Sequence, residues 1–241
     1  MKANIQNKRA IILTGTIIPN SVHTSHIDPL SRLDDYMTAL QFYCEALSHD
    51  DIYFIENSEF DLSPHKQFTE LQSENHSKVI RYPKSTEYSK GKGYQEFEMV
   101  QKAVEDLRKQ YNFFIKITGR YRITNIQKLI KNLYSGYYID LRKYWKISEV
   151  YLLAFDIDAF ERCIKDAYKT VHDEAGIYIE SILYAKIKEA NYKTRLFPST
   201  PVLAGVSGSN SIILKRNPVR KFVRNLERKL NRILGENKFF Y

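Results

Sequence analysis

Short apolar runs alternate with amphipathic segments along most of this 241-residue chain, and this alternation constrains its fold more than any other feature. The runs typical of buried strands are 10–13, 52–55, 113–117 and 149–155. Between them, apolar residues recur every three or four positions, as they do in helices that cover a sheet. Strands that alternate with helices predict an α/β sandwich with a largely parallel central sheet.

The other predicted elements complete this pattern. The helical spacing extends over 32–47, 97–111, 126–134, 160–171 and 177–190, and shorter strands are predicted at 78–80 and 194–197. The stretch 82–94 is polar, basic and glycine-bearing, which predicts a mobile loop with Lys90 and Lys92 free to meet a ligand.

Composition allows one medium-sized domain and indicates a reducing compartment. Hydrophobic residues make up 43% of the chain, which is enough for a substantial core. Cys44 and Cys163 are isolated and lack metal-ligand spacing, as expected of a cytosolic protein. We find no signal peptide and no apolar run near the ~20 residues that span a bilayer, so we expect a soluble or peripheral protein.

Positive charge is concentrated at the C-terminus. Residues 215–241 contain nine lysines and arginines against two glutamates, a net charge of +7 out of +9 for the whole chain. The remainder, 1–214, is therefore nearly neutral, and we expect no nucleic-acid partner for it. We divide the chain into a domain at 1–214 and a basic amphipathic helix at 215–241.

Residues 217–234 have the pattern of a helix that lies on a membrane surface. Asn217-Pro218 is a good helix start, and an apolar stripe alternates with a row of arginines at every fourth position. We expect such a helix to bind anionic membrane lipids through its basic face and to bury its apolar face. The alternative is a terminal helix docked on its own domain.

The segment 113–121 carries the clearest chemical signal. Its apolar strand contains Lys116 and ends in Thr118-Gly119-Arg120-Tyr121. Parallel strands deliver side chains to a ligand cleft at their carboxyl ends, and two cations beside a glycine suit a phosphate. The alternative is a core strand followed by an ordinary turn.

Two further small-residue turns are candidates for close approach by a nucleotide. Thr14-Gly15-Thr16 follows the first strand, and Ser207-Gly208 lies in a polar loop near the end of the domain. Glycine, serine and threonine let a backbone approach a ligand closely. Plain tight turns would have the same composition.

Together, these motifs resemble a family of bacterial glycosyltransferases that build capsule, O-antigen and lipopolysaccharide sugars. The matching segments extend from about residue 10 to 215, and the most distinctive is Lys-Ile-Thr-Gly-Arg-Tyr at 116–121. The others are Ile-Leu-Thr-Gly-Thr-Ile at 12–17, Asp28-Pro29 with Arg32 and Asp35-Tyr36, Lys-Gly-Lys-Gly-Tyr-Gln-Glu at 90–96, Gly-Ile-Tyr-Ile-Glu at 176–180 and Gly-Val-Ser-Gly-Ser at 205–209.

The resemblance implies a GT-A-like, Rossmann-related fold that transfers a sugar from a nucleotide donor, here expected to be UDP-linked. It also implies a lipid-linked oligosaccharide acceptor, met at the cytoplasmic face of the inner membrane. Mapped onto this chain, the donor-binding residues would be Thr14, Gly15, Thr16, Arg32, Lys92, Lys116, Thr118, Gly119, Arg120, Tyr121, Ser207 and Gly208.

One departure from the family pattern bears on metal use. GT-A enzymes commonly hold a divalent metal on an Asp-X-Asp at the end of the strand where this chain has Thr-Gly-Arg-Tyr. We therefore expect no cofactor and predict that Lys116 and Arg120 supply the positive charge. Asp156-Ile157-Asp158 remains as an alternative Mn²⁺ or Mg²⁺ site, although two aspartates at this spacing also cap a helix well.

Inverting transfer needs a base for the acceptor hydroxyl, and Asp173, Glu174 and Glu180 are the candidates. Glu180 matches the family-like Gly-Ile-Tyr-Ile-Glu and lies near a predicted helix start. Two other classes stay open: a nucleic-acid-binding protein that uses the basic tail, and a phosphatase or other metal hydrolase built on Asp156 and Asp158.

Overall fold

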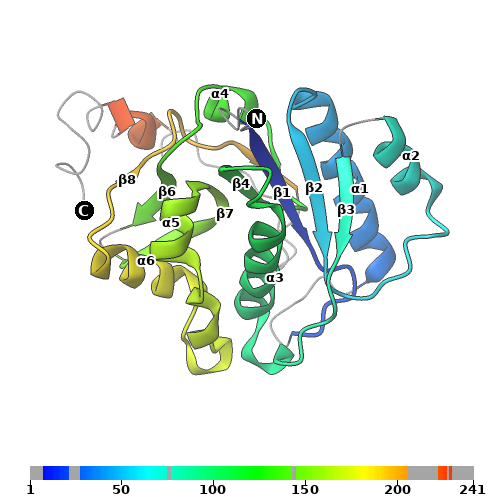
Figure 1. The fold of residues 1–241 in the computed structure, drawn as a ribbon, viewed down its shortest axis with the longest axis horizontal. Helices are drawn as coiled ribbons and strands as arrows, with labels where there is room; N and C mark the ends of the chain where they lie inside the picture. The colour runs from blue at the N-terminus through cyan, green and yellow to red at the C-terminus, as the bar shows by residue number, and fades with distance from the viewer. Residues whose placement is uncertain are drawn as a thin grey trace.

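The computed structural model describes residues 8–21, 28–74, 77–142, 145–205, 222–226 and 228–229. Seven strands form its central sheet, in the order β3-β2-β1-β4-β7-β6-β8 (Figure 1). They are β1 (Arg9–Gly15), β2 (Asp51–Glu56), β3 (Ser77–Arg81), β4 (Phe113–Thr118), β6 (Tyr137–Arg142), β7 (Ile147–Asp156) and β8 (Thr194–Arg195). A second sheet pairs β5 (Arg122–Ile123) with β9 (Leu203–Ala204).

The sheet is mostly parallel, as predicted. The strands β3, β2, β1 and β4 run in one direction, and the arrows of β1, β2 and β3 point toward the lower edge of Figure 1. Strand β7 runs antiparallel to both of its neighbours, β4 and β6. The carboxyl ends of β1, β2 and β4 therefore meet at one edge of the sheet, while β7 ends at the opposite edge.

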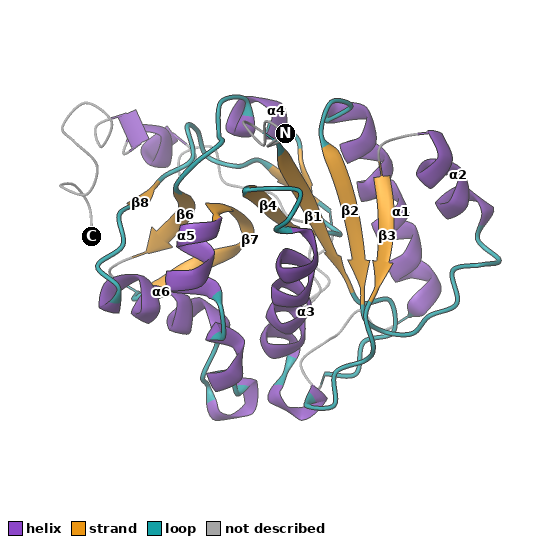
Figure 2. Ribbon diagram, in the orientation of Figure 1, coloured by secondary structure: helices purple, strands orange, loops and turns teal. Residues whose placement is uncertain are grey.

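Helices cover both faces of this sheet (Figure 2). Their bounds are α1 (Pro29–Ala46), α2 (Lys66–Glu74), α3 (Lys92–Leu107), α4 (Ile126–Ile130), α5 (Ile157–Ala159) and α6 (Ile179–Glu189), with short turns at η1 (Tyr88–Lys90), η2 (Phe160–Ile164), η3 (Ala167–Thr170) and η4 (Asp173–Ala175). Within the described part of the chain, none is long and apolar enough to span a bilayer.

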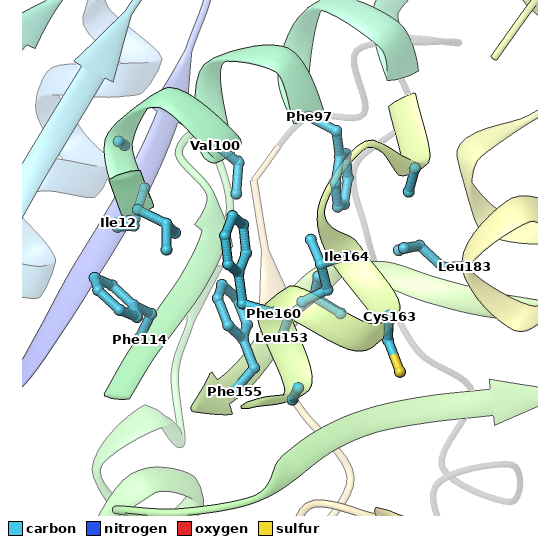
Figure 3. Packing of buried hydrophobic residues seen from close by; sticks show 14 of the residues in the cluster. Ile12, Phe97, Val100, Phe114, Leu153, Phe155, Phe160, Cys163, Ile164 and Leu183 are labelled. Carbon is cyan, nitrogen blue, oxygen red and sulfur yellow. The ribbon is translucent and has the colours of Figure 1, made fainter. Parts of the chain in front are cut away.

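Alternation along the strands divides the core into two layers. Ala10 and Ile12 of β1 face a cluster that includes α3, η2 and α6, whereas Ile11 and Leu13 face α1 and α4. Figure 3 shows the first cluster, in which the rings of Phe155 and Phe160 stack between the sheet and the helices. Burial on both faces explains why these strands appear in the sequence as continuous apolar runs.

Strand β6 was not predicted, because a charged residue interrupts it. Asp140 lies in the middle of Tyr137–Arg142 and is almost completely buried. Its carboxylate accepts two bonds from Arg228 Nη2, at 2.7 and 2.6 Å, and Arg228 is equally buried. Arg228, 88 residues away in the sequence, thus neutralises the charge of Asp140, which interrupts the apolar pattern of this strand.

Two local predictions need correction. Lys92 lies at the first residue of α3 and not in a mobile loop, because the helix begins directly after Gly91. The helix predicted at 160–171 is divided into η2 and η3, since Asp166 between them has a left-handed backbone conformation with φ of 61°.

The described part of the C-terminal segment docks on the domain with its arginines inward. Arg228 binds Asp140, and the side-chain oxygen of Asn225 accepts the backbone N–H of Thr200. Phe222, Val223 and Leu226 are instead 70%, 56% and 48% exposed. The other predicted residues of 217–234 lie outside the described ranges.

Candidate active site

A cleft of about 640 Å³ opens at the carboxyl ends of β1 and β4. Segments that are distant in the sequence form its walls, from the turn after β1, from α1 and α3, and from the start of α6. Ten of the predicted site residues line it: Thr14, Gly15, Thr16, Arg32, Lys92, Thr118, Arg120, Tyr121, Asp173 and Glu180. The structure therefore brings most of the predicted site together.

The remaining predicted site residues do not line this cleft. Lys116 and Gly119 lie beneath its floor, and Glu174 is exposed outside it. Ser207 and Gly208 lie outside the described residues.

Two arginines from different elements meet at one end of the cleft. Arg32 of α1 and Arg120 after β4 both lie beside the ring of Tyr36, at 5.8 and 6.0 Å from their guanidinium carbons to its centroid. Only 8% of Arg120 is exposed, and its Nη1 has no hydrogen-bond partner among the residues that the structure describes. Buried donors are normally satisfied, so this group is available to an anion that enters the cleft.

Arg32 is held in place by the turn that follows β1. Its Nε donates to the carbonyl oxygen of Thr16 at 2.9 Å, and its Nη2 donates to the Tyr36 hydroxyl at 3.1 Å. The Thr16 hydroxyl in turn donates to the side chain of Asn57 at 2.7 Å. Burial lowers the pKa of Arg32, and the charge of Arg120 lowers it further. An anion in the cleft would relieve both effects.

Lys116, which is buried beneath the cleft, forms an ion pair with Glu96, which lines it. Lys116 Nζ lies 2.6 Å from Glu96 Oε1, and it also donates to the Thr118 hydroxyl and to the carbonyl oxygen of Val150. Glu96 Oε1 additionally accepts the hydroxyls of Thr14 at 2.5 Å and Thr118 at 3.2 Å. The three ammonium contacts of Lys116 are thus inside the protein, so the structure does not support its predicted contact with phosphate.

Gly119 is required by packing. Its N–H donates to the carbonyl oxygen of Thr14 at 2.9 Å, and a Cβ at this position would lie 2.5 Å from that same oxygen. Only glycine lets the end of β4 approach β1 so closely. The approach positions Arg120, the next residue, at the mouth of the cleft.

Two of the predicted carboxylates, Asp173 and Glu180, also line the cleft. Asp173 accepts the backbone N–H of Lys92 at 2.9 Å and so stabilises the start of α3. Glu180 lies in the first turn of α6 and is half-buried. Burial raises the pKa of Glu180, with further contributions from the charges of Glu96 and Asp173. A carboxylate in this environment is a better proton acceptor than an ordinary glutamate.

The alternative metal site at Asp156 and Asp158 is not part of this cleft. Asp156 pairs in register with Phe113, the first residue of β4, and so lies at the opposite edge of the sheet. Its carboxylate accepts the backbone N–H groups of Gly136 and Ala159, which caps α5. Asp158 is 3.8 Å from Arg162 on the surface. The helix-cap alternative therefore holds for Asp156, and neither aspartate lies in the cleft.

The donor groups of the cleft also do not form a conventional metal centre. Among the described residues, no group of three or more histidines, cysteines, aspartates and glutamates could hold a metal ion. The charged groups that lie beside Tyr36 in the cleft are the two guanidiniums of Arg32 and Arg120.

Glu96 and Tyr36 were given no role from the sequence, although both lie in motifs that carry the family resemblance. A signal for Glu96 was available. A lysine within a buried strand needs a buried anion, and the helix that precedes β4 is the nearest element that can provide one. This inference was not drawn because Lys116 was assigned a phosphate as its partner.

We predict that the Lys116–Glu96 pair stabilises the protein only as a pair. Lys116→Met leaves the Glu96 carboxylate without its cation and should lower the free energy of unfolding by about 3 kcal/mol. Adding Glu96→Gln should recover most of this loss, because the double variant buries no unpaired charge. Urea denaturation of the three proteins measures both effects. A double variant as unstable as Lys116→Met would contradict the pairing.

No protein-family model matches the chain, and no curated protein matches it. The structure is similar to that of a Desulfovibrio desulfuricans G20 protein assigned as a nucleotide-diphospho-sugar transferase, with a TM-score of 0.51 and 16% identity, over 78% of this chain and 79% of that one. A mannosyltransferase from Pyrobaculum calidifontis, solved with GDP-Man and Mn²⁺, aligns with a TM-score of 0.47 and 11% identity, over 97% and 66%. A cytidylyltransferase from Leptospira borgpetersenii aligns with a TM-score of 0.45 and 10% identity, over 97% and 99%.

At these identities the likeness is one of fold, and it agrees with the predicted α/β architecture. The chain has a Rossmann-like fold that is found in nucleotide-diphospho-sugar transferases.

Proposed function

We propose that this protein is a glycosyltransferase that transfers a sugar from a nucleoside-diphosphate sugar to an acceptor hydroxyl. The observation that carries the proposal is the buried pair of Arg32 and Arg120, with Arg120 Nη1 unpartnered among the described residues. Two guanidiniums match the charge and the oxygen geometry of a diphosphate, which is the leaving group of such a donor. The fold supports the same class of donor.

In the proposed reaction, Glu180 takes the proton of the acceptor hydroxyl. The acceptor oxygen then forms a bond with the anomeric carbon of the sugar as the bond from that carbon to the diphosphate oxygen breaks. The electron pair leaves with the diphosphate, and Arg32 and Arg120 stabilise the charge that develops there. Attack from the face opposite the leaving group inverts the configuration. No step uses a metal, although added Mn²⁺ or Mg²⁺ is part of the test below.

We further propose that the acceptor is a lipid-linked glycan of cell-surface polysaccharide synthesis and that the enzyme works at the inner face of the cell membrane. The exposed side chains of Phe222, Val223 and Leu226 support this, because apolar groups beside a strongly basic segment suit an anionic bilayer. A nucleic-acid role for the same segment is less favoured, since Arg228 is buried against Asp140.

We predict that UDP, or another nucleoside diphosphate, raises the melting temperature of the protein in the presence of EDTA. Arg120→Ala should abolish this shift, because it removes Nη1, the hydrogen-bond donor that has no partner among the described residues. Arg122→Ala, two residues along the chain and outside the cleft, is the matched control and should keep the shift. A shift that needs Mn²⁺ or Mg²⁺ would argue for metal-dependent donor binding, and stabilisation by nucleoside triphosphates alone would indicate a nucleotidyltransferase.

We predict that Glu180 controls the acid limb of the pH–activity profile. Since its pKa is raised, kcat/KM should fall with decreasing pH at a higher pH than an ordinary glutamate would produce. Glu180→Gln should lower kcat by roughly a hundredfold or more and remove this limb. Glu189→Gln, an exposed position on the same helix, should change neither. An acid limb that persists in Glu180→Gln would exclude Glu180 as the base.

We predict that replacing Phe222, Val223 and Leu226 together with serine weakens binding to phosphatidylglycerol vesicles about tenfold or more, because three apolar side chains no longer enter the bilayer. Co-sedimentation measures the bound fraction. Leu30→Ser is the control, since Leu30 is 64% exposed but lies outside this segment. Equal binding to phosphatidylcholine vesicles, or equal loss in the control, would count against a specific membrane contact.

A further inference from the structure

Glu96 carries an arrangement that the proposed mechanism does not use. The hydrogen bonds that described residues make to its carboxylate both end on Oε1, and this is also the oxygen that Lys116 approaches. The side chain is 22% exposed and lines the cleft. One oxygen is thus fixed from inside the protein, while Oε2 is left to whatever enters the cleft.

The donors that fix Glu96 make it rigid. The ammonium group of Lys116 is completely buried, and the hydroxyls of Thr14 and Thr118 come from two adjacent strands. A carboxylate held by three groups in this way keeps one orientation, which is what a specific ligand contact requires.

Glu96 is held at the ends of β1 and β4, the two strands at which the cleft opens. Arg32 is bound to the turn that follows β1, at the carbonyl oxygen of Thr16. Glu180 lies beside β7, which is on the other side of β4, and its carbonyl oxygen accepts the hydroxyl of Ser148 in that strand. In a nucleotide sugar, the sugar ring lies between the diphosphate and the acceptor hydroxyl, so Glu96 is where the ring would be.

The charge state of Glu96 suits contact with hydroxyl groups. Burial alone would raise its pKa, but the charge of Lys116 and the hydrogen bonds from Lys116, Thr14 and Thr118 outweigh burial and hold the pKa below its ordinary value. An ionised carboxylate only accepts hydrogen bonds, and the hydroxyls of a sugar ring are its natural donors in a cleft. Glu180, with a raised pKa, has the opposite character.

We propose that Glu96 binds hydroxyl groups of the transferred sugar through Oε2 and that Lys116 is the positioning residue that holds Glu96 in place. This inference rests on the proposed function, since it names the part of the donor that the centre of the cleft recognises. The unpartnered Nη1 of Arg120 is independent support, among the described residues, for a ligand in the same cleft. In this arrangement the arginines bind the diphosphate and Glu96 selects the sugar.

The test compares binding of a nucleoside diphosphate with binding of the corresponding nucleotide sugar. Isothermal titration would use UDP against UDP-glucose, UDP-galactose and UDP-N-acetylglucosamine, and GDP against GDP-mannose. The variants are the double substitution E96Q/K116M, which leaves no unpaired charge, and E96D. E96D keeps the charge, but its shorter side chain moves the carboxylate away from the cleft. E105Q is the matched control, an exposed glutamate on the same helix.

We expect both Glu96 variants to bind the bare diphosphate as wild type does and to bind the nucleotide sugar about tenfold more weakly, since they lose a hydrogen bond to a charged group. Unchanged affinity for the sugar form in both variants would overturn the inference while leaving the proposed function intact. Equal losses for both ligands that appear only with Mg²⁺ or Mn²⁺ would also overturn it, because Glu96 would then be a metal ligand. If wild type binds none of these nucleotides, the proposed function fails and the inference falls with it.

Discussion

The ion pair between Lys116 and Glu96 connects the parts of this protein on which its cleft depends. Lys116 is buried beneath the cleft and Glu96 lines it, and the pair joins α3 to the ends of β1 and β4 through the hydroxyls of Thr14 and Thr118. A lysine in the centre of a sheet is costly unless its charge is matched and its donors are used. Here both conditions are met, so a residue that would otherwise destabilise the core fixes a carboxylate at its surface.

The cleft beside this pair is lined by charges of both signs. Arg32 and Arg120 lie together despite their mutual repulsion, while Lys92 and Arg142 line the cleft with the carboxylates of Glu96, Asp173 and Glu180. Like charges held together in the absence of a ligand store unfavourable energy that a ligand of opposite charge releases on binding. The diphosphate of the donor proposed above would be such a ligand for the two arginines.

The described part of the C-terminal segment packs on the domain with an unexpected face inward. A basic amphipathic helix on a soluble domain would ordinarily bury its apolar face and expose its arginines. In the described part of this segment, Arg228 instead pairs with Asp140 inside the protein, and Phe222 and Leu226 face outward. The buried ion pair that makes β6 possible thus also determines which face of the segment meets the surroundings.

Local periodicity was enough to predict most of the architecture. The strands at 10–13, 52–55 and 113–117 and the helix that precedes the third of them follow from patterns within a few residues. Most of the predicted donor-binding residues also line one cleft, because residues after parallel strands meet at one edge of the sheet.

What the sequence could not determine depends on contacts between distant segments. Strand β6 depends on Arg228, which neutralises Asp140. Lys116 is paired with Glu96 inside the protein and not with a phosphate, as the sequence had suggested. The reversed direction of β7 moved Asp156 to the far edge of the sheet, although the strand itself was predicted. Strand direction and charge pairing are tertiary properties because residues far apart in the chain decide them, whereas periodicity is local and can be seen in the sequence alone.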